Sequence, residues 1–430
     1  MIAAEVLLWG TRIGIVSQED AQHVPVFRYD DTFIGSGIEV APLTMPLGGR
    51  AYSFPNLNVT SFHLLPGLLS DSLPDKFGTA LLRRYMEEQG RSFSDLTSVE
   101  RLLYTGVRGM GALEFQPAYD MTESYDSAID LDALVQLASD VLTERKKLRI
   151  PKGSHAMEQL LSVGSSAGGA RAKAIIAIND ETGEIRSGQI DAGEGFSYWL
   201  LKFDGVSNNK DKGGRADGAL FTRIEYAYSL MARAAGIQMN ECRLHEENGR
   251  FHFLTRRFDR EETSGQKIHM QTLGAIAHLD FNQAGASSYE QAADVIYRLG
   301  MDQTAVEELY RRMVFNVITR NQDDHVKNIS FLMDRHGIWR LSPAYDLTYA
   351  CDADNYWLAR HQMSINGKLE NITKDDLLQS ASTMNISRSR AQHMIGQVVD
   401  AAAEYTNYAK QAQIPSAVAK EIVKQFHLMY

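Results

Sequence analysis

Apolar residues recur every three or four positions in several stretches of the chain, and this spacing predicts amphipathic helices. The pattern is clearest just before Arg320, where one apolar face carries Val306, Leu309, Tyr310, Met313 and Val317. The same spacing predicts further helices over residues 75–88, 131–145, 222–235 and much of 373–428. The second half of the chain is therefore expected to be mostly helical.

Short apolar runs bounded by turn residues predict strands. In the first 60 residues, runs on either side of a turn at Gly10 predict a hairpin, and another strand follows, at residues 6–9, 13–16 and 24–29. Later runs predict strands at 174–178, 198–203, 251–259, 329–333 and 338–341, with Gly337 in the turn between the last two. The beginning of the chain is therefore expected to be β-rich.

The length of 430 residues is too great for one ordinary core, so two or three domains are expected. Residues 143–153 are rich in Lys and Arg and end in Pro-Lys-Gly, which marks them as the best linker candidate. The predicted division is an N-terminal domain over 1–145, a second domain over 146–260 and a helical domain over 261–430.

The net charge of −10 argues against a chain that binds DNA by itself, but it allows a local basic patch or a basic partner. Two cysteines, Cys242 and Cys351, cannot form a disulfide framework. No apolar run approaches the roughly 18 residues of a membrane helix, and Glu5 interrupts the apolar segment 2–9, unlike a secretory leader. We expect a cytoplasmic protein without membrane contact.

The candidate chemistry is concentrated between Asn321 and Asp346. Asp323 is followed by Asn328 five residues later, and Asp346 comes eighteen residues after that. Phosphoryl transfer from ATP uses one Asp to orient a hydroxyl and accept its proton, and an Asn and a second Asp to hold magnesium. The spacing is that of the protein-kinase catalytic loop, although no His-Arg precedes Asp323 and Leu-Thr follows Asp346.

Clusters of Asp and Asn are also common in ordinary turns, where they bond their own backbone. Here the cluster follows a predicted helix and precedes a predicted hairpin, the order that the helical half of a kinase requires. This context favours catalysis over a simple turn.

Upstream, residues 162–173 combine small residues and glycines, which allow backbone N–H groups to approach phosphates. Lys202 follows in an apolar strand; a lone lysine there usually points to solvent, but after such a loop it is expected to reach the ATP phosphates. Glu225 lies in the first turn of a predicted helix. The sequence leaves open whether it pairs with Lys202 or is a surface charge favoured by the helix dipole.

These motifs resemble the HipA family of toxin–antitoxin serine/threonine kinases over most of the chain. The similar segments are the Gly-rich loop 164–173, Leu201–Phe203, the hinge Arg257–Arg260, the catalytic loop Asn321–Asn328 and Ala344–Asp346. Leu69–Asp75 resembles the family's N-terminal domain signature. The resemblance implies an α+β fold, namely an atypical bilobal protein-kinase-like fold with a β-rich N-terminal domain and a mostly helical C-lobe.

The resemblance also implies roles for individual residues, with ATP and Mg²⁺ as cofactors. Asp323, Lys202 and Lys327 would be catalytic, and Asn328 and Asp346 would bind the metal. The residues expected at the nucleotide are Gly168, Gly169, Ala170, Arg171, Lys173, Lys202, Glu225, Arg257, Phe258, His325, Lys327, Asn328 and Asp346. Ser166, or Ser165, would be the autophosphorylated serine of the Gly-rich loop.

The implied partners are a HipB-like helix-turn-helix antitoxin, operator DNA mainly through that antitoxin, and a substrate from the translation machinery of the aminoacyl-tRNA synthetase class. Two alternatives remain. A small-molecule phosphotransferase of aminoglycoside or choline kinase type is disfavoured by the β-rich N-terminal domain and the Ser-rich loop. A catalytically quiet corepressor that binds an antitoxin on DNA is disfavoured by the intact Lys202, Asp323, Asn328 and Asp346.

Overall fold

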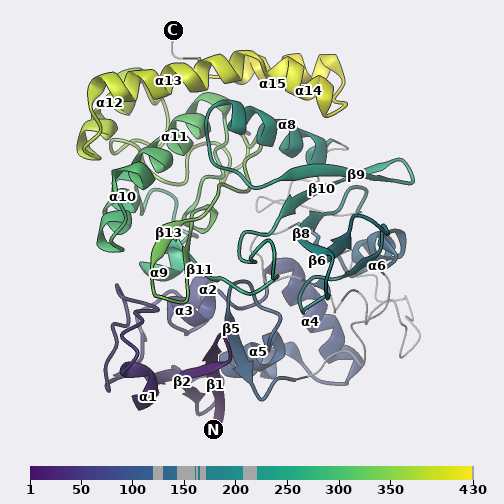
Figure 1. Cartoon of the computed structure of the whole chain (residues 1–430), viewed down its shortest axis with the longest axis vertical. Helices are drawn as coiled ribbons and strands as arrows, with labels where there is room; N and C mark the ends of the chain where they lie inside the picture. Colours follow the sequence, from purple (N-terminus) through teal and green to yellow (C-terminus); the bar gives the residue numbers. More distant parts are fainter. Residues whose placement is uncertain (120–128, 143–159, 161–162, 165–170, 207–219, 429–430) are drawn as a thin grey trace. The chain divides into compact units, whose positions relative to one another are not determined.

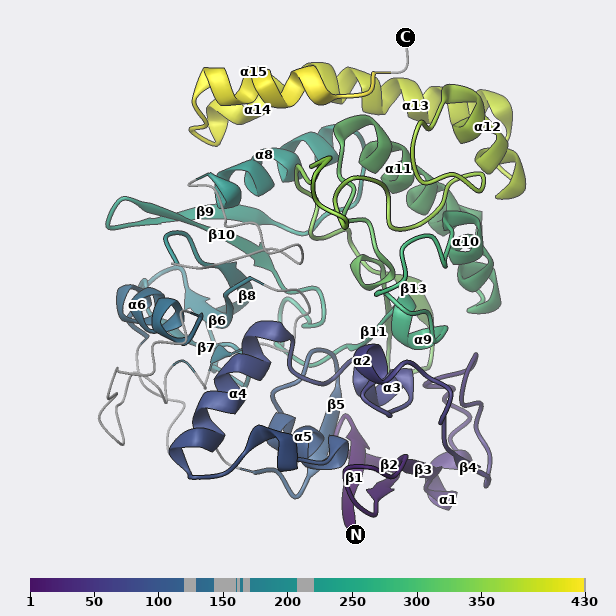
Figure 2. The same ribbon diagram turned by 180° about the vertical axis from the view of Figure 1, so that it is seen from behind.

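The computed structural model describes residues 1–119, 129–142, 160, 163–164, 171–206 and 220–428, with the backbone alone for 140–142. The chain forms two compact units. The first comprises residues 1–217, 245–271 and 332–338, and the second comprises residues 218–244, 272–331 and 339–430. Figure 1 and Figure 2 show the elements from opposite sides.

The β-rich beginning of the chain is a five-stranded antiparallel sheet in the order β4-β3-β2-β1-β5. Its strands are Ile2–Leu8 (β1), Thr11–Gln18 (β2), Val26–Tyr29 (β3), Ala51–Tyr52 (β4) and Leu113–Gln116 (β5). The hairpin turn consists of Trp9 and Gly10, with φ of 51° and 77°. A two-residue turn with positive φ at both positions matches the right-handed twist of the paired strands. The turn therefore begins at Trp9, one residue earlier than predicted, and β1 ends at Leu8.

A second five-stranded sheet has the order β7-β6-β8-β10-β9. Its strands are Lys173–Asn179 (β6), Ile185–Ser187 (β7), Phe196–Lys202 (β8), Cys242–Glu247 (β9) and Arg250–Arg256 (β10). The predicted strands at 174–178, 198–203 and 251–259 are confirmed with boundaries that differ by one to three residues. In the antiparallel register of β6 and β8, Lys173 lies opposite Lys202.

The helices Lys76–Glu88 (α4) and Leu131–Leu142 (α6) share a core with β6 and β8 (Figure 2). Asp75 caps α4 by accepting a hydrogen bond from the Gly78 backbone N–H. The buried residues of this core include Phe77, Leu81, Leu134, Val135, Ile176 and Leu201. The helices α4 and α6 belong to the expected domain 1–145, and the strands β6 and β8 belong to the expected domain 146–260. One hydrophobic core therefore contains residues of both expected domains. The expected boundaries at 145 and 260 remain predictions.

The shorter helical segments near the N-terminus lie between the strands of the first sheet in the sequence. They are Asp31–Ile34 (α1), Val59–Phe62 (α2), Gly67–Ser70 (α3), the 3-10 turn Phe93–Asp95 (η1) and Ser98–Thr105 (α5). A reciprocal pair of hydrogen bonds between Thr97 and Glu100 caps α5.

The second unit is mostly helical, as predicted. Its helices are Phe221–Ala234 (α8), Leu273–Ile276 (α9), Tyr289–Arg298 (α10), Gln303–Thr319 (α11), Lys374–Thr383 (α12), Arg388–Ala403 (α13), Tyr405–Gln411 (α14) and Ser416–Gln425 (α15). Both views show α13 and α14 beside α8 (Figures 1 and 2). Every residue of α11 from Leu309 to Thr319 is buried, so this helix is the centre of the unit.

The predicted hairpin after the catalytic loop is confirmed, with Ser330–Met333 (β12) and Trp339–Leu341 (β13) joined through Gly337 at φ 80°. Both strands belong to a three-stranded sheet with His269–Thr272 (β11). The fold class is thus a mixed α and β fold, β-rich in its N-terminal part and helical in its C-terminal part. Within the described ranges, none of the helices has the length and apolar character needed to cross a bilayer.

Candidate active site

The predicted catalytic loop follows α11 directly. Arg320 ends this helix in the left-handed conformation, at φ 60°, and turns the chain into the loop. The loop closes in the 3-10 turn Val326–Asn328 (η2), where the Asn328 Nδ2 donates a 2.8 Å hydrogen bond to the Asp323 backbone oxygen. The side chain of Asp323 is 31% exposed. The structure therefore brings Asp323 and Asn328 together, with the Asp323 side chain partly accessible and its Oδ1 buried.

His325 and Lys327 lie beside this pair. The His325 Nε2 is 3.9 Å from the Asp323 Oδ1, which is longer than a hydrogen bond. The Lys327 ammonium lies over the ring of Phe281, 4.6 Å from its centroid, and the Phe281 and His325 rings are 6.0 Å apart. Sequence reasoning missed Phe281, because no motif marks it and only folding places it under the lysine.

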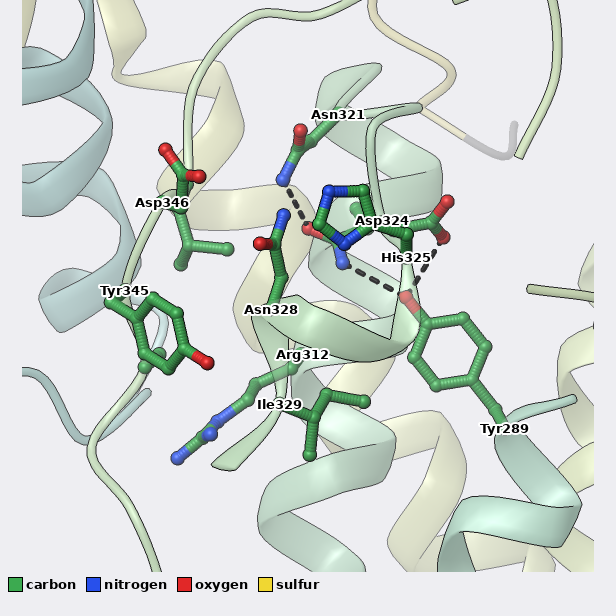
Figure 3. Close-up of a pocket in the computed structure, with 12 residues that line it drawn as sticks. Tyr289, Arg312, Asn321, Asp324, His325, Asn328, Ile329, Tyr345 and Asp346 are labelled. Atoms are coloured by element: carbon green, nitrogen blue, oxygen red, sulfur yellow. Dashed lines mark hydrogen bonds between the residues drawn. The ribbon is translucent and has the colours of Figure 1, made fainter. Parts of the chain in front are cut away.

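A small cavity of about 20 Å³ lies against the loop (Figure 3). Its lining residues are Tyr289, Arg312, Asn316, Asn321, Asp324, His325, Asn328, Ile329, Ala344, Tyr345, Asp346 and Leu347. Both expected metal ligands line it, so the structure brings Asn328 and Asp346 to one site across eighteen residues of sequence. Asp323 is not among the residues that line the cavity.

Asp346 has a left-handed backbone conformation, at φ 56°. This region is uncommon for residues other than glycine, although Asp and Asn enter it more readily than most. The preceding residue holds the segment in place: the Tyr345 hydroxyl donates a 2.6 Å hydrogen bond to the Lys327 backbone oxygen and pairs with the Ser330 hydroxyl at 2.5 Å. Tyr345 therefore joins the Asp346 segment to the end of the catalytic loop.

The side chains of Asn328 and Asp346 fit a hard cation such as magnesium, which prefers oxygen ligands. The Asn328 nitrogen is engaged by the Asp323 backbone oxygen, so its amide oxygen is the atom left to act as a ligand. Figure 3 shows this oxygen on the side of the cavity where Asp346 lies. The Asp346 carboxylate and the Asn328 amide oxygen would together supply oxygen ligands to a metal ion that also binds phosphate.

The neighbour of Asp323 has buried hydrogen-bond partners. Asp324 is buried and contacts Tyr289 and His361, at 2.8 Å each. Burial, and then the Asp324 carboxylate, raise the pKa of Tyr289 well above its usual range, so the phenol stays neutral and donates. Sequence reasoning missed all three residues. The doubled Asp at 323 and 324 was visible, but its partners are far along the chain.

In the first unit, Lys202 is the last residue of β8 and is buried at 7% exposure. Lys173 lies opposite it on β6, and its Nζ is 3.2 Å from the Asp75 Oδ2. The sequence placed Lys173 at the end of the Gly-rich loop; in the structure it is a buried strand residue with a carboxylate partner. Arg171, two residues earlier, is half-buried.

The hinge segment carries a buried ion-pair cluster. The Arg257 guanidinium binds both carboxylate oxygens of Asp259, at 2.8 and 2.7 Å, and also donates to the Gly188 backbone oxygen. Asp259 accepts in addition from Arg260 and from the Gly111 N–H. The guanidinium expected at the nucleotide is thus engaged within the protein, and the Arg257 backbone N–H also donates, to the Tyr198 oxygen at 2.9 Å. Phe258, between these residues, is half-buried.

Glu225 is buried on α8, at 2% exposure, which excludes the surface-charge interpretation. Lys202 belongs to the other unit, so their pairing stays a prediction. The expected nucleotide contacts Gly168, Gly169 and Ala170, the candidate phosphorylation sites Ser165 and Ser166, and the linker 143–153 lie outside the described residues.

Comparisons with known proteins agree with this chemistry. The chain is 26% identical over 134 residues to "Putative kinase Y4mE" of Sinorhizobium fredii, covering 29% of the chain and 32% of that protein. It is 31% identical over 103 residues to "Putative kinase" of Haemophilus influenzae, covering 22% of the chain and 30% of that protein. The matches thus span about a third of the length of these relatives. Together with the loop geometry, they define a kinase-like protein.

Family comparisons are more specific. Residues 165–406 match the HipA-like C-terminal domain, and residues 4–116 match the HipA N-terminal domain. The chain therefore belongs to the HipA family. The fold is also that of HipA of Shewanella oneidensis, solved in a complex with HipB and its operator DNA, with a TM-score of 0.67, 16% identity and coverage of 98% of this chain and 95% of that one. The expected HipA-type, kinase-like fold is confirmed.

Proposed function

We propose that the protein is an ATP-dependent serine/threonine protein kinase, the toxin of a type II toxin–antitoxin pair. One observation carries this proposal: the loop places Asn328 on the backbone of Asp323 and beside Asp346, and the Asp323 side chain remains 31% exposed. Membership of the HipA family supports the toxin role. ATP and magnesium are the proposed cofactors.

In the proposed reaction, the Asp323 carboxylate orients a serine or threonine hydroxyl and accepts its proton. The hydroxyl oxygen forms a bond to the γ-phosphorus of ATP while the bond from that phosphorus to the ADP oxygen breaks, and ADP leaves. Lys202 and Lys327 would bind phosphate oxygens. Asn328 and Asp346 would hold magnesium, which neutralises phosphate charge when bound.

The proposed partners follow from the family. The Shewanella HipA was solved with HipB and operator DNA, so we propose a HipB-like helix-turn-helix antitoxin for this chain, with DNA bound mainly through it. The net charge of −10 supports a division in which the partner supplies most phosphate contacts. The proposed substrate is a protein of the translation machinery, of the aminoacyl-tRNA synthetase class.

Incubation of the purified protein with labelled ATP and magnesium tests the proposal. We expect label on the protein itself and on a serine or threonine of an added aminoacyl-tRNA synthetase, and none without magnesium. Transfer only to small alcohols or aminoglycosides would replace the proposal by a small-molecule phosphotransferase. Failure to bind nucleotide at all would replace it by a quiet corepressor.

A further inference from the structure

Asp324 is buried at 3% exposure, whereas the side chain of its neighbour Asp323 is 31% exposed. Its Oδ1 accepts a 2.7 Å hydrogen bond from the Gln362 backbone N–H. Its Oδ2 accepts one of 2.8 Å from the Tyr289 hydroxyl and lies 2.8 Å from the His361 Nδ1. Both carboxylate oxygens are thus engaged, and every contact reaches a segment distant in the sequence.

Two of these partners, His361 and Gln362, belong to the segment that follows Asp346. This segment runs beside residues 285–289, with hydrogen bonds from the Gly285 N–H to the Gln362 oxygen at 2.8 Å and from the Ser364 N–H to the Ser287 oxygen at 2.8 Å. Asp324 therefore joins the catalytic loop to a pair of adjacent segments that already bind each other.

The third partner of Asp324, Tyr289, is connected to the start of the catalytic loop through Asn316. The Asn316 Nδ2 donates to the Tyr289 hydroxyl at 2.9 Å, and the Asn321 Nδ2 donates to the Asn316 Oδ1 at 2.9 Å. Figure 3 shows these hydrogen bonds around Tyr289. The loop is consequently held at Asn321 and at Asp324 by one connected set of buried hydrogen bonds, and Asp323, with a side chain that is 31% exposed, lies between these two anchors.

We infer that Asp324 is a positioning residue for phosphoryl transfer, which fixes the backbone of Asp323 against the segments 285–289 and 361–365. This inference rests on the proposed kinase function. Asp323 and Asp324 are consecutive, so a shift of the Asp324 anchor moves the carboxylate that must meet the hydroxyl. A displacement of about 1 Å at a reacting group costs on the order of 10²-fold in rate. Of the proposed nucleotide and metal contacts, Lys202 and Asp346 lie outside this loop, so the KM for ATP should change much less than kcat.

A purely stabilising role is the competing explanation, since buried, fully bonded carboxylates also hold proteins together. If Asp324 only stabilised the fold, its replacement would lower the unfolding temperature, but the molecules that stay folded would keep the wild-type kcat and KM. If Asp324 positions Asp323, its replacement lowers kcat much more than it changes the KM for ATP. The positioning role also predicts that the loop and segment 361–365 become mobile together when Asp324 is replaced.

Asp324→Asn keeps the size of the side chain and removes its charge. We expect kcat to fall by roughly 10²-fold with the KM for ATP within about threefold of wild type, and amide hydrogen exchange to rise in both 321–328 and 361–365. Tyr289→Phe, which removes one donor, should give a smaller change in the same direction and serves if Asp324→Asn does not fold. Asp375→Asn, an exposed carboxylate at the start of α12, is the matched control.

Wild-type kcat in folded Asp324→Asn, or a loss explained wholly by a higher KM, would overturn the inference. A wild-type protein that transfers no phosphate would refute the proposed function instead. Amide hydrogen exchange of Asp324→Asn would then still test whether Asp324 anchors the loop. Exchange equal to wild type in 321–328 and 361–365 would reject the anchoring, and a joint increase in both segments would support it.

Discussion

The side-chain nitrogen of Asn328 donates a 2.8 Å hydrogen bond to the backbone oxygen of Asp323, five residues earlier in the chain. This bond closes the loop through the Asp323 backbone oxygen and the Asn328 nitrogen, and it uses neither the Asp323 carboxylate nor the Asn328 amide oxygen. The spacing of five residues therefore has a local structural meaning, since it lets one asparagine close the loop through its nitrogen while its oxygen remains for the proposed metal.

Replacement of Asp323 by alanine should abolish transfer while folding and ATP binding remain nearly intact, because Asn328 binds the backbone of Asp323 and not its side chain. Loss of a positioned base lowers rates by about 10²–10⁴-fold. Label transfer, unfolding temperature and an ATP titration measure the three properties. Asp375→Ala is the control, and wild-type self-labelling by Asp323→Ala would show that the catalytic assignment is wrong.

Asp346→Asn should weaken nucleotide binding in magnesium by about tenfold or more, equivalent to roughly 1.4 kcal/mol, and leave metal-free binding unchanged. Asparagine suits this test because it tolerates the left-handed conformation at φ 56°, so the backbone keeps its shape. Calorimetric titration of ATP with magnesium and with a chelator separates the two conditions. Equal weakening in both would remove Asp346 from the metal site.

Asp259→Asn should destabilise the first unit strongly. Burial opposes the charge of Asp259, but Arg257 and Arg260 hold the pKa of this carboxyl below its usual range. Removing one partner of a buried ion pair typically costs about 3–5 kcal/mol. Urea unfolding measures the difference. Glu262→Gln is the matched control, because Glu262 pairs with Arg256 while 77% exposed, and such pairs contribute at most about 1 kcal/mol.

Acidification should destabilise the protein partly through His269. Burial lowers the pKa of this imidazole from 6.5 to about 3. The unfolded chain therefore binds a proton below about pH 6.5 that the folded chain does not accept, so the contribution is present above that pH and lost as the pH falls. Between about pH 6.5 and about pH 5 the expected loss is roughly 2 kcal/mol.

Unfolding free energies of wild type and His269→Gln across this pH window test the prediction. Glutamine retains an acceptor for the Gln271 amide, which lies 3.0 Å from the His269 Nε2. The variant should show a smaller loss on acidification, whereas His393→Gln, at an exposed position of α13, should behave as wild type. Parallel curves for all three proteins would contradict the assignment.

Ser166, or Ser165 if the register differs by one, should be phosphorylated by the protein itself, and the modified form should bind ATP poorly. A phosphate adds roughly −1.5 to −2 charges to a loop expected to hold ATP phosphates, so the two repel. Mass spectrometry after incubation with ATP locates the site, and nucleotide titration of the modified fraction gives the effect. An unmodified loop, or one modified with unchanged ATP affinity, would refute self-inactivation.

The sequence alone determined the positions of the main helices and the pairing of groups that lie close together in the chain. Periodic apolar residues placed α4 and α8 within one residue and the end of α11 near Arg320, because a helix needs only its own residues to define a buried face. The Asp323–Asn328 pairing was also readable, since both groups lie within one short loop. Turn positions were less exact: the first hairpin turns at Trp9 and Gly10 because both residues adopt positive φ.

Only the tertiary structure decided which distant side chains meet. Asp324 finds Tyr289 and His361 across 35 and 37 residues, and Lys173 finds Asp75 across β6 and α4. Sequence patterns report which residues are buried, but the partner of a buried charge depends on how whole elements pack. The sequence therefore named the candidate reactive groups of this HipA-family chain, and the packing of segments far apart in the sequence set the buried contacts that hold the candidate loop.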